Sequence, residues 1–571
     1  MKKWVVTAKR ADFDAIGRQF HISPMLARII RNRDMQTPEE IERFLNGTLA
    51  DLPDPSSLKG VDMAAALLQG AIEGGGAIRV VGDYDVDGIC ATYILVTALR
   101  DCGAEVSWQI PDRIRDGYGL NRSIVEKAVD DKISLLLTCD NGIAAVSEIA
   151  YAKEEGMCVI VTDHHEAPEV LPDADVIIDP KEPGSNYPYP DICGAVVAWK
   201  LTQVLCKRMG VPEREEHLQF AAFATVCDVM PLLHENRIIV KYGLEALKHT
   251  QNAGLDALLT VTGINRDMLA AYHFGFILGP CVNATGRLDE AERALELFMT
   301  EDEHHALLSA QELKRLNEER KNITLAATEQ AIAIVQSGDA HNPAMQDDKV
   351  LVIYLPDCHE SIAGIVAGKV REHYYRPTIL LTGTESGQIK GSGRSIEAYN
   401  MFAGLQAVSE LFVKFGGHKM AAGMSLAGEA EVNKLRTRLN AQATLTEADL
   451  TEKLTIDIAM PLRFATETFV EELDRLSPYG TGNPRPVFAQ KGLKIRNVRV
   501  QGDAHNVVKV DFEDETVVGV LFGDGDAFAE TYHAGDTVMV AYTPVINEFR
   551  GVRSVEAQIK EIKPDTLVAP A

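Results

Sequence analysis

The chain has 571 residues, which at about 100–200 residues per domain leaves room for three or four domains. Hydrophobic residues make up 46% of the sequence and charged residues 25%, a balance that excludes disordered and collagen-like classes. The formal net charge is −26, whereas a nucleic-acid-binding surface is usually basic. The charge therefore counts against a nucleic-acid partner, but it leaves open a local basic groove or cations supplied as bound metal.

The cysteines and the apolar runs indicate the cellular compartment. Nine cysteines are scattered singly without a CxxC pair, which argues against a disulfide framework and against a structural zinc site. No apolar run approaches the roughly 18–20 residues of a membrane span, and the basic N-terminus lacks the apolar region of a secretory signal. We therefore expect a cytoplasmic protein with no membrane partner.

The first three predicted regions are a helical segment, an α/β domain and a connecting helix. Residues 1–60 are predicted to be helical, because Pro24 and the Thr37-Pro38-Glu39-Glu40 motif are typical helix starts. In residues 61–300, short apolar runs first alternate with amphipathic stretches, as in βαβ units of a parallel sheet, and mostly helical sequence follows. Residues 301–345 are predicted to form the connecting helix, because leucines recur at roughly helical spacing within a charged segment.

Two further regions complete the chain. Residues 346–450, which follow a polar break, are predicted to form a second α/β region. Residues 451–571 contain short alternating runs punctuated by Gly, Asp and Pro, a pattern typical of a small β-barrel. The predicted fold class is α/β, with two α/β lobes joined by a long helix and a C-terminal β-barrel.

Acidic residues and histidines follow three of the predicted strands, at the point where each strand ends. The three segments are Asp83-Tyr-Asp85-Val-Asp87, Asp140-Asn-Gly and Asp163-His164-His165. In an open parallel sheet, residues beyond the carboxyl ends of the strands lie together, so we expect one cluster. Clustered carboxylates repel each other, and protons or cations must neutralise them.

The donor types in this cluster favour metal ions. Carboxylates with two imidazoles and no thiolate cluster suit hard divalent ions such as Mn²⁺ or Mg²⁺, and about five or six ligands suit two ions that hold a phosphate and activate a water molecule. An isolated DxD is more often a turn, and a lone His pair is more often a packed site. Three such segments at successive strand ends are difficult to explain as coincidence, so the sequence predicts a two-metal site.

These segments, together with Asp228 in Thr-Val-Cys-Asp-Val-Met, resemble the four metal motifs of the DHH phosphoesterases. The resemblance runs nearly end to end, through Asn-Ala-Thr-Gly-Arg at 283–287, Gly-Ser-Gly-Arg-Ser at 391–395 and Gly-Gly-His-Lys-Met-Ala-Ala-Gly at 416–423. Within this superfamily the chain is similar to the bacterial single-strand-specific 5′→3′ DNA exonucleases. The resemblance implies a DHH catalytic domain at 61–300, a DHHA1 domain at 346–450 and an OB-like nucleic-acid-binding domain at 451–571.

The resemblance also implies a role for each residue of the cluster. The implied metal ligands are Asp85, Asp87, Asp140, His164 and Asp228. Three further residues complete the predicted catalytic set. His165 is the implied active-site imidazole, which stabilises the phosphate or assists proton transfer, and Asp163 is expected to orient a histidine. Asp83 is either a ligand or only a hydrogen-bond acceptor, and we prefer the second role.

Hydrolysis of a polyanion needs positive charge around the phosphate. The candidate substrate-binding residues are Arg113, Asn283, Arg287, Ser392, Arg394, Gly416, Gly417 and His418. The resemblance places the three arginines around the scissile phosphate and the 5′-terminal phosphate. The segment 416–423 is either a tight turn or a cradle for an anion, and its small residues favour the cradle.

A basic stripe precedes the end of the chain. Residues 484–500 contain Arg485, Lys491, Lys494, Arg496 and Arg499 but no acidic residue. Aromatic residues lie within this stripe and beyond it, namely Phe488, Tyr542 and Phe549. Single-strand-binding surfaces combine such cations with stacking aromatics; the alternative is a solvated strand face with aromatics in the core.

The resulting hypothesis is a Mn²⁺- or Mg²⁺-dependent exonuclease that degrades single-stranded DNA. The resemblance implies 5′→3′ polarity, preference for DNA and a role in recombination and repair. Single-stranded DNA is the implied partner, with a single-strand-binding protein and a helicase as further candidates. Two alternatives remain: another DHH-family phosphodiesterase such as an oligoribonuclease, which generally lacks an OB-like domain, and a catalytically silent DHH scaffold, which is expected to have lost ligands.

Overall fold

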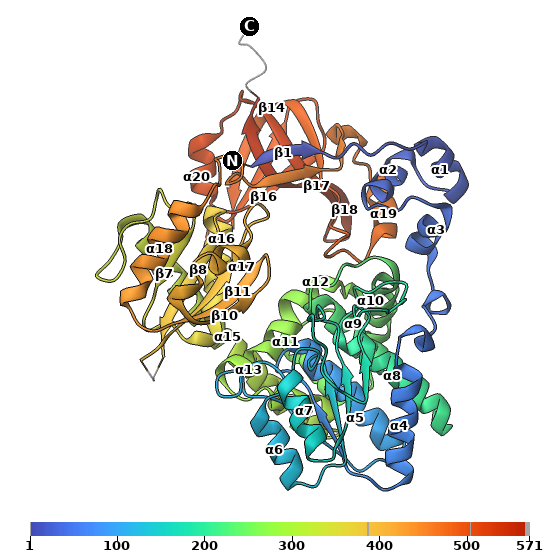
Figure 1. Ribbon diagram of the computed structural model, residues 1–571. Helices are drawn as coiled ribbons and strands as arrows, with labels where there is room; N and C mark the ends of the chain where they lie inside the picture. Colours follow the sequence, from blue (N-terminus) through green and yellow to red (C-terminus); the bar gives the residue numbers. More distant parts are fainter. Residues whose placement is uncertain (1, 385–386, 503, 566–571) are drawn as a thin grey trace. The chain divides into compact units, whose positions relative to one another are not determined.

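The computed structural model describes residues 2–384, 387–502 and 504–565. The chain divides into two compact units (Figure 1). Unit 1 comprises Met1–Leu52, Pro231–Lys241 and Lys453–Ala571, and unit 2 comprises Pro53–Met230 and Tyr242–Glu452. Within the described residues, every helix is too short or too polar to serve as a membrane span.

Unit 2 begins with a five-stranded parallel sheet of order β3-β2-β4-β5-β6. Its strands are β2 (Ile78–Val81), β3 (Val106–Gln109), β4 (Leu135–Cys139), β5 (Cys158–Thr162) and β6 (Val176–Ile178). The covering helices are α4 (Val61–Glu73), α5 (Val86–Asp101), α6 (Arg122–Asp130), α7 (Val146–Glu154) and α8 (Gly194–Met209), after the short η2 (Pro55–Ser57). Because helices cover both faces, β2 and β4 are fully buried, which explains their continuous apolar sequences.

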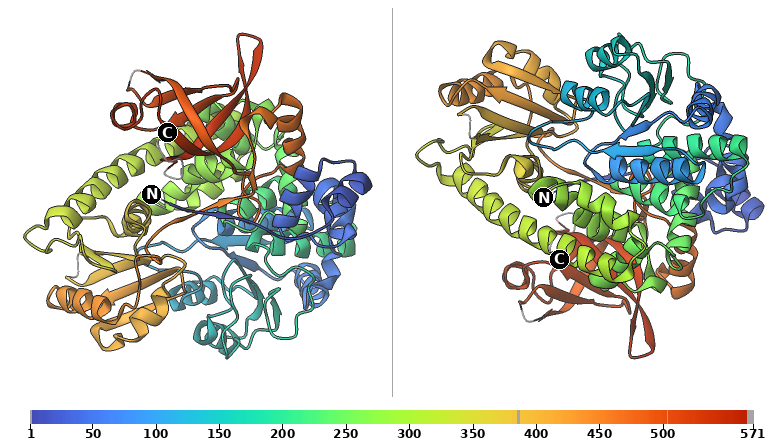
Figure 2. Two further views of the ribbon diagram at one scale, coloured as in Figure 1. Left: turned by 90° about the horizontal axis from the view of Figure 1, so that it is seen from above. Right: turned by 90° about the horizontal axis from the view of Figure 1, so that it is seen from below.

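A mostly helical region follows and leads into a single long helix. Its elements are α9 (His217–Cys227), α10 (His234–Leu247), α11 (Ala253–Thr262), η3 (Arg266–Met268), α12 (Ala271–His273), the π-helical η4 (Phe274–Leu278), α13 (Gly279–Leu288) and α14 (Glu292–Met299). The first part of α10, up to Lys241, belongs to unit 1. The long helix α15 (Glu303–Ser337) is a continuous yellow-green rod in Figure 2. It contacts α11, α13 and α14 as well as α16 and β7, so it joins the two lobes of unit 2.

The second lobe of unit 2 is a mixed sheet of order β10-β11-β9-β8-β7, in which only β7 and β8 are parallel. Its strands are β7 (Leu351–Tyr354), β8 (Thr378–Gly383), β9 (Ile389–Arg394), β10 (Phe412–Gly417) and β11 (Ala421–Leu426). Its helices are α16 (Glu360–Tyr374), α17 (Met401–Gln406), η5 (Ser409–Leu411) and α18 (Ala430–Gln442).

Unit 1 is built on a closed β-barrel of order β13-β14-β15-β16-β18-β17, in which β14 also pairs with β17. The strands are β13 (Ile458–Ala459), β14 (Phe488–Gln501), β15 (Val507–Phe512), β16 (Val518–Phe522), β17 (Thr537–Phe549) and β18 (Val552–Pro564). The helices are α1 (Phe13–Phe20), α2 (Pro24–Asn32), α3 (Pro38–Asn46), η1 (Leu49–Asp51), η6 (Leu462–Phe464), α19 (Glu467–Leu473), η7 (Asp474–Leu476) and α20 (Gly525–Thr531). The apolar residues of α2 and α3 share one hydrophobic core with the barrel.

The predicted architecture of two α/β lobes, a long helix and a C-terminal barrel is confirmed. The expectation that residues 1–60 are wholly helical is wrong at the start, where Lys3–Val6 forms strand β1. This strand pairs in parallel with β12 (Lys453–Ile456). The Lys-Trp-Val-Val sequence favours a strand, and its partner lies some 450 residues away along the chain, which no local pattern reveals.

A buried arginine organises the interior of unit 1. Arg237 is 3% exposed, and its guanidinium donates hydrogen bonds to the carbonyls of Phe44, Arg475, Leu476, Ser477 and Pro478 at 2.7–3.3 Å. It also lies over the Phe44 ring, 4.0 Å from the centroid. One side chain therefore satisfies carbonyls of two separate segments, and no apolar residue can replace these donors.

We predict that Arg237→Met destabilises unit 1 by about 3 kcal/mol or more, because five backbone carbonyls, some of them buried, lose their charged donor. The measurement is urea-induced unfolding followed by circular dichroism. Arg18→Met, at an exposed position on α1, is the control and should change stability by less than about 0.5 kcal/mol. Equal unfolding curves for the two variants would contradict this role.

Candidate metal centre

The first three carboxylates of the site are arranged by the turn between β2 and α5. Asp85 is the N-cap of α5, and its Oδ1 accepts hydrogen bonds from the backbone N–H groups of Asp87 (2.9 Å) and Gly88 (3.2 Å). Asp83 lies in the same turn, two residues before Asp85. Its Oδ1 accepts a long hydrogen bond of 3.4 Å from Gly119 N–H. Burial and the nearby Asp85 carboxylate raise the pKa of Asp83 well above its usual value.

Asp87 is held by the N-terminus of α8. Its Oδ2 accepts from Gly194 N–H and its Oδ1 from Ala195 N–H, each at 2.7 Å. The positive end of the helix dipole and these two donors favour the carboxylate form. Burial and the Asp85 charge have the opposite effect and raise the pKa of Asp87 to about 6.

Asp140 follows β4 in a constrained backbone conformation. Its φ is +59°, in the left-handed region that non-glycine residues rarely adopt. The side chain is buried, and burial together with Asp87 raises its pKa well above the usual value. Gly194 lies against it so closely that a Cβ at position 194 would be 2.7 Å from the Asp140 Cβ.

His164 lies between carboxylates that come from three elements. Its Nε2 is 3.1 Å from Asp140 Oδ1, 3.5 Å from Asp87 Oδ2 and 3.6 Å from Asp228 Oδ2. Burial and the adjacent His165 lower the pKa of His164 to about 3, so the ring is neutral and its nitrogen can act as a ligand. Asp228, at the C-terminal end of α9, has a buried Oδ2 that accepts no hydrogen bond from the described residues.

Asp163 orients the neighbouring His165 rather than facing the other carboxylates. Its Oδ1 is 2.7 Å from His165 Nδ1, and its Oδ2 accepts from Ile143 N–H at 2.9 Å. Burial opposes ionisation of Asp163, but the bond from His165 lowers its pKa overall. Burial also opposes protonation of His165, yet the bond to Asp163 raises the pKa of His165 to about 9. Tyr118 adds a contact, since its hydroxyl is 3.2 Å from His165 Nδ1 and donates to the Asp140 carbonyl at 2.6 Å.

The donor atoms form three groups in which all ligand atoms lie within 4.8 Å of one another. The groups are Asp140–His164–His165, Asp87–His164–Asp228 and Asp83–Asp85–Asp140. Divalent cations fit this set, because the donors are oxygen and imidazole nitrogen, their charges repel, and Asp228 Oδ2 is buried without a hydrogen-bond donor among the described residues. Asp83 and His165 are thus placed as possible ligands, in addition to the five residues predicted as such.

Three arginines from separate segments lie near one another. Arg113 is also near enough to Asp83 to oppose the rise of the Asp83 pKa that burial causes. Arg287, on α13, donates to the Ser361 carbonyl at 2.5 Å, while Ser361 Oγ donates to the Arg287 carbonyl at 2.9 Å. Arg394, on β9, donates to Ser392 Oγ at 2.9 Å. Arg113 lies over the Tyr84 ring, 4.3 Å from its centroid.

These guanidinium groups lack a carboxylate within ion-pair distance among the described residues. Burial and the charge of Arg113 lower the pKa of Arg287 to about 9 and also lower the pKa of Arg394. Asn283 is half-buried one helical turn before Arg287, so both residues lie on the same face of α13. Concentrated, unpaired guanidinium groups beside a carboxylate cluster form a site for an anion such as phosphate.

Of the predicted substrate-binding residues Gly416, Gly417 and His418, only Gly416 lines a groove near the site. A groove of about 490 Å³ is lined by Gly416, Ser392, Lys390 and Lys414 and by Gly117 from the first lobe. Gly417 is the last residue of β10 and His418 follows it, and neither lines this groove. Gly417 has a φ of +143°, and a Cβ there would lie 2.5 Å from Ala422 Cα, so this glycine is required by the close approach of the two strands.

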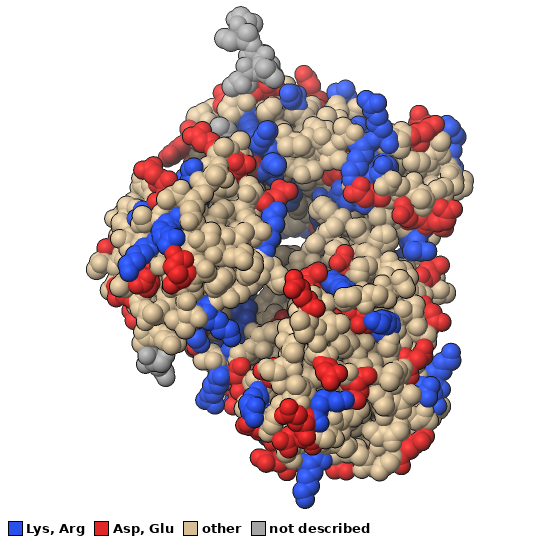
Figure 3. All heavy atoms as spheres, in the orientation of Figure 1, with Lys and Arg blue, Asp and Glu red and all other residues tan. Residues whose placement is uncertain are grey.

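In unit 1, two of the aromatics beside the basic stripe belong to the core. Phe488 and Tyr542 are 0% exposed and pack on each other with ring centroids 5.9 Å apart, so the expectation that they stack on bases is wrong. Phe549, by contrast, is 66% exposed. Lys494 and Arg499 form ion pairs with Glu513 and Asp511. Figure 3 shows acidic side chains interspersed with basic ones over the visible face.

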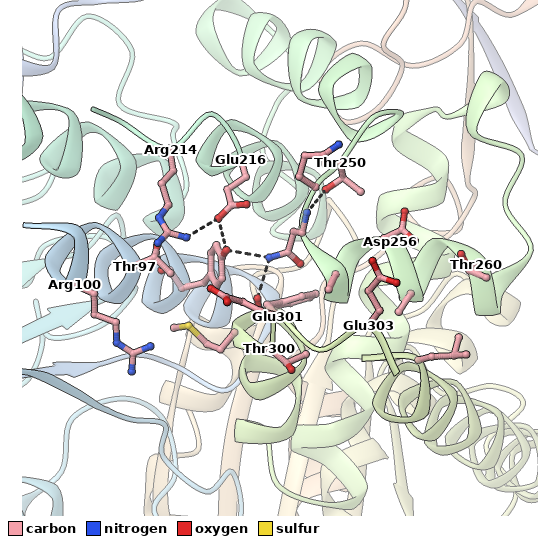
Figure 4. Close-up of a pocket in the computed structure, with 18 residues that line it drawn as sticks. Thr97, Arg100, Arg214, Glu216, Thr250, Asp256, Thr260, Thr300, Glu301 and Glu303 are labelled. Atoms are coloured by element: carbon pink, nitrogen blue, oxygen red, sulfur yellow. Dashed lines mark hydrogen bonds and ion pairs between the residues drawn. The ribbon is translucent and has the colours of Figure 1, made fainter. Parts of the chain in front are cut away.

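A separate cavity of about 780 Å³ lies toward the other end of α5 (Figure 4). Tyr93 lines it and donates to Glu216 Oε1 at 2.5 Å, while Asn252 Nδ2 donates to Tyr93 Oη at 3.0 Å. Arg214 lies 3.2 Å from the same Glu216 oxygen. These three side chains and Asn252 therefore bind one another, and none of the predicted site residues lines the cavity.

Comparison with known proteins agrees with this geometry. The family model described as the DHH family, N-terminal domain matches residues 77–225, the DHHA1 domain model matches 347–445, and the RecJ OB domain model matches 456–561. The single-stranded-DNA-specific exonuclease RecJ of Bacillus subtilis is 35% identical over 98% of this chain and 70% of its own length. The chain belongs to the RecJ family.

Other RecJ proteins are similar over their whole length or in structure. The RecJ of Escherichia coli is 32% identical, with 99% of this chain and all of that protein covered. The crystal structure of RecJ from Thermus thermophilus in complex with Mn²⁺ superposes with a TM-score of 0.84 at 30% identity, covering 100% of this chain and 81% of that one. A Mg²⁺ complex of the same protein gives a TM-score of 0.78.

The RecJ-family site also contains residues that the sequence analysis missed. Tyr118 lies between two glycines, in Asp-Gly-Tyr-Gly, a signal that could have indicated a functional loop. Gly194 begins α8 after a non-helical segment, which is a recognisable helix start. Arg320, on α15, lies near enough to Arg287 to depress its pKa; in the sequence it is one of many cations on a charged helix.

We predict that Gly194→Ala destabilises unit 2 by about 1–3 kcal/mol, because the added methyl group forces Asp140 or α8 to move. It should also reduce the increase in melting temperature that saturating Mn²⁺ produces, since Asp87 and Asp140 both depend on this contact. Differential scanning calorimetry measures both effects. Gly70→Ala, in α4 with nothing within 4 Å of the new Cβ, is the control and should be neutral or stabilising.

Proposed function

We propose that this RecJ-family protein is a Mn²⁺- or Mg²⁺-dependent exonuclease that removes nucleotides from the 5′ end of single-stranded DNA. The observation that carries the proposal is the cluster of carboxylates and histidines at the strand ends, directly beside three unpaired arginines. Relatives that match almost the whole chain carry the name single-stranded-DNA-specific exonuclease. The domain matched as the RecJ OB domain argues against the oligoribonuclease alternative, and the complete donor set argues against a silent scaffold.

We assign the metal ions to Asp85, Asp87, Asp140, His164 and Asp228, with Asp83 as a further candidate. When bound, the ions supply charge neutralisation and Lewis-acid activation of a water molecule. The chain's own contribution is to hold the donors: α8 fixes Asp87, the left-handed turn fixes Asp140, and burial keeps His164 neutral.

The remaining groups act on the phosphate. His165, held through Nδ1 by Asp163, presents the Nε2 proton to a non-bridging oxygen or to the leaving group. Arg287 holds the scissile phosphate, and Arg394 with Ser392 and Arg113 holds the 5′-terminal phosphate. A groove lined by residues of both lobes of unit 2 admits one strand, which excludes a duplex.

The proposal extends to the cellular setting. A cytoplasmic exonuclease of this kind acts in recombination and repair, with a helicase that supplies single strands and a single-strand-binding protein as partners. The described residues of unit 1 include the unpaired cations Lys491 and Arg496 on β14. These residues and the exposed Phe549 are suited to holding the strand outside the metal centre.

We predict that the protein releases mononucleotides from the 5′ end of a labelled single strand in the presence of Mn²⁺, and that EDTA abolishes this activity. Asp140→Ala should lower the rate by about 10³-fold or more, because it removes a donor shared by two of the three groups. The assay compares 5′- and 3′-labelled single strands, a blunt duplex and short RNA. Release from the 3′ end or preferential cleavage of RNA would contradict the proposal.

Arg394 provides a test of end recognition. We predict that Arg394→Ala weakens the preference for 5′-phosphorylated over 5′-hydroxyl strands by about 10–100-fold, because one charge-assisted contact to the terminal phosphate is lost. The measurement is kcat/KM for both strands. Lys434→Ala, which removes an exposed cation of α18 in the same lobe, is the control. An equal loss on both strands would assign Arg394 to the scissile phosphate instead.

A further inference from the structure

Two cysteines that are distant in the sequence meet at the ends of two neighbouring helices. Cys102 directly follows the last residue of α5, and Cys206 lies in the last turn of α8. The two thiols are hydrogen-bond partners, with the Cys206 thiol donating to the Cys102 sulfur. Both residues are buried, being 7% and 4% exposed. The nine cysteines are scattered singly in the sequence, so only the packing of α5 on α8 brings this pair together.

The chemistry of this pair differs from that of the other cysteines. The hydrogen bond from Cys206 lowers the pKa of the Cys102 thiol, although burial and the Asp101 carboxylate oppose this shift. The same bond raises the pKa of Cys206. Burial raises the pKa of every other thiol of the chain, namely Cys90, Cys139, Cys158, Cys193, Cys227, Cys281 and Cys358. Cys102 is therefore the cysteine that most readily forms a thiolate, and the thiolate is the form that reacts with oxidants.

The two helices that carry the pair begin at the metal centre. Asp85 caps the first turn of α5, and Gly194 in the first turn of α8 donates to Asp87. Each helix has 16 residues and spans roughly 24 Å, so the cysteines lie far from the metal-binding side chains. A bond between the two cysteines joins the far ends of these helices and leaves the metal-binding residues untouched.

We propose that Cys102 and Cys206 form a reversible disulfide in the presence of hydrogen peroxide, and that this bond stabilises the first lobe of unit 2. The proposal is independent of the proposed exonuclease function. A bond between positions 102 and 206 closes a loop of roughly 100 residues, and a cross-link across so long a loop strongly restricts the unfolded chain. Small thiols reverse such a bond, so the cross-link persists only while the oxidant is present.

The reaction consumes one peroxide molecule and both thiols. The Cys102 thiolate attacks one peroxide oxygen, the O–O bond breaks, and the departing hydroxide becomes water with the proton that Cys102 released. Cys102 is then a sulfenic acid, and the Cys206 sulfur attacks its sulfur atom. The S–O bond breaks as the S–S bond forms, and the second hydroxide takes the Cys206 proton and leaves as water. The two sulfur atoms together lose two electrons, and the peroxide is reduced to two water molecules.

Peptide mapping of the whole protein after oxidation tests the pairing. The protein in EDTA is treated with a small molar excess of hydrogen peroxide, N-ethylmaleimide blocks the remaining thiols, and the digest is analysed by mass spectrometry without reduction. We expect two peptides linked through Cys102 and Cys206, which dithiothreitol separates. Cys358→Ser, at a half-buried cysteine of the second lobe, is the control and should cross-link as the wild type does.

Two serine variants distinguish the roles of the two thiols. Cys206→Ser keeps a hydrogen-bond donor beside Cys102 and should accumulate a sulfenic acid there, which dimedone traps. Cys102→Ser should leave Cys206 reduced, because its thiol has no thiolate partner. The pairing is overturned if both wild-type thiols stay reduced, if either cysteine pairs with a different one, or if dimedone labels Cys206 in Cys102→Ser.

Calorimetry tests the effect on stability. The oxidised wild type should melt about 5 °C or more above the reduced wild type, and dithiothreitol should abolish the difference. Both serine variants should melt at the same temperature with and without peroxide. An unchanged or lower melting temperature of the cross-linked protein would overturn the proposed stabilisation. These measurements need no nuclease activity, so they test the disulfide whether or not the protein cleaves DNA.

Discussion

The buried carboxylates at the ends of β2 and β4 repel one another, and the surrounding part of unit 2 holds them together against that repulsion. The carboxylates of Asp87 and Asp140 both lie next to the same ring nitrogen of His164. The first turn of α8 donates two backbone hydrogen bonds to Asp87, and its glycine allows Asp140 to approach. Asp140 itself keeps a left-handed backbone. Strain and repulsion of this kind persist only where the surrounding structure imposes them and a cation relieves them.

The positive charge opposite this cluster is assembled from three segments that are distant in sequence. Arg113 comes from the first lobe, Arg287 from α13 in the helical region that precedes the long helix α15, and Arg394 from the second lobe. The reciprocal hydrogen bonds between Arg287 and Ser361 connect α13 to α16 and thereby join the two lobes at the site. Because the arginines and the carboxylates are held on different segments, they do not form ion pairs with each other. The arginines therefore stay available to a phosphate, and the carboxylates to its metal ions.

Local patterns in the sequence predicted most of the fold. The alternation of apolar runs with amphipathic stretches indicated the parallel sheet, and the leucine spacing indicated α15, because both patterns arise from burial of one continuous face. Strand β1 escaped prediction because its partner β12 is remote in sequence. Phe488 and Tyr542 were assigned to a binding surface because an aromatic residue in a strand has the same appearance whether it faces the core or the solvent.

The sequence by itself determined which chemistry this protein carries, since carboxylates and histidines directly after three strands must meet at one edge of a parallel sheet. Tertiary structure alone decided how these groups are used. It made His164 neutral through burial, selected His165 as the histidine that Asp163 holds, and placed Asp83 among the possible ligands. These outcomes depend on desolvation and on contacts between segments far apart in the chain, and neither is encoded in the spacing of residues within a motif.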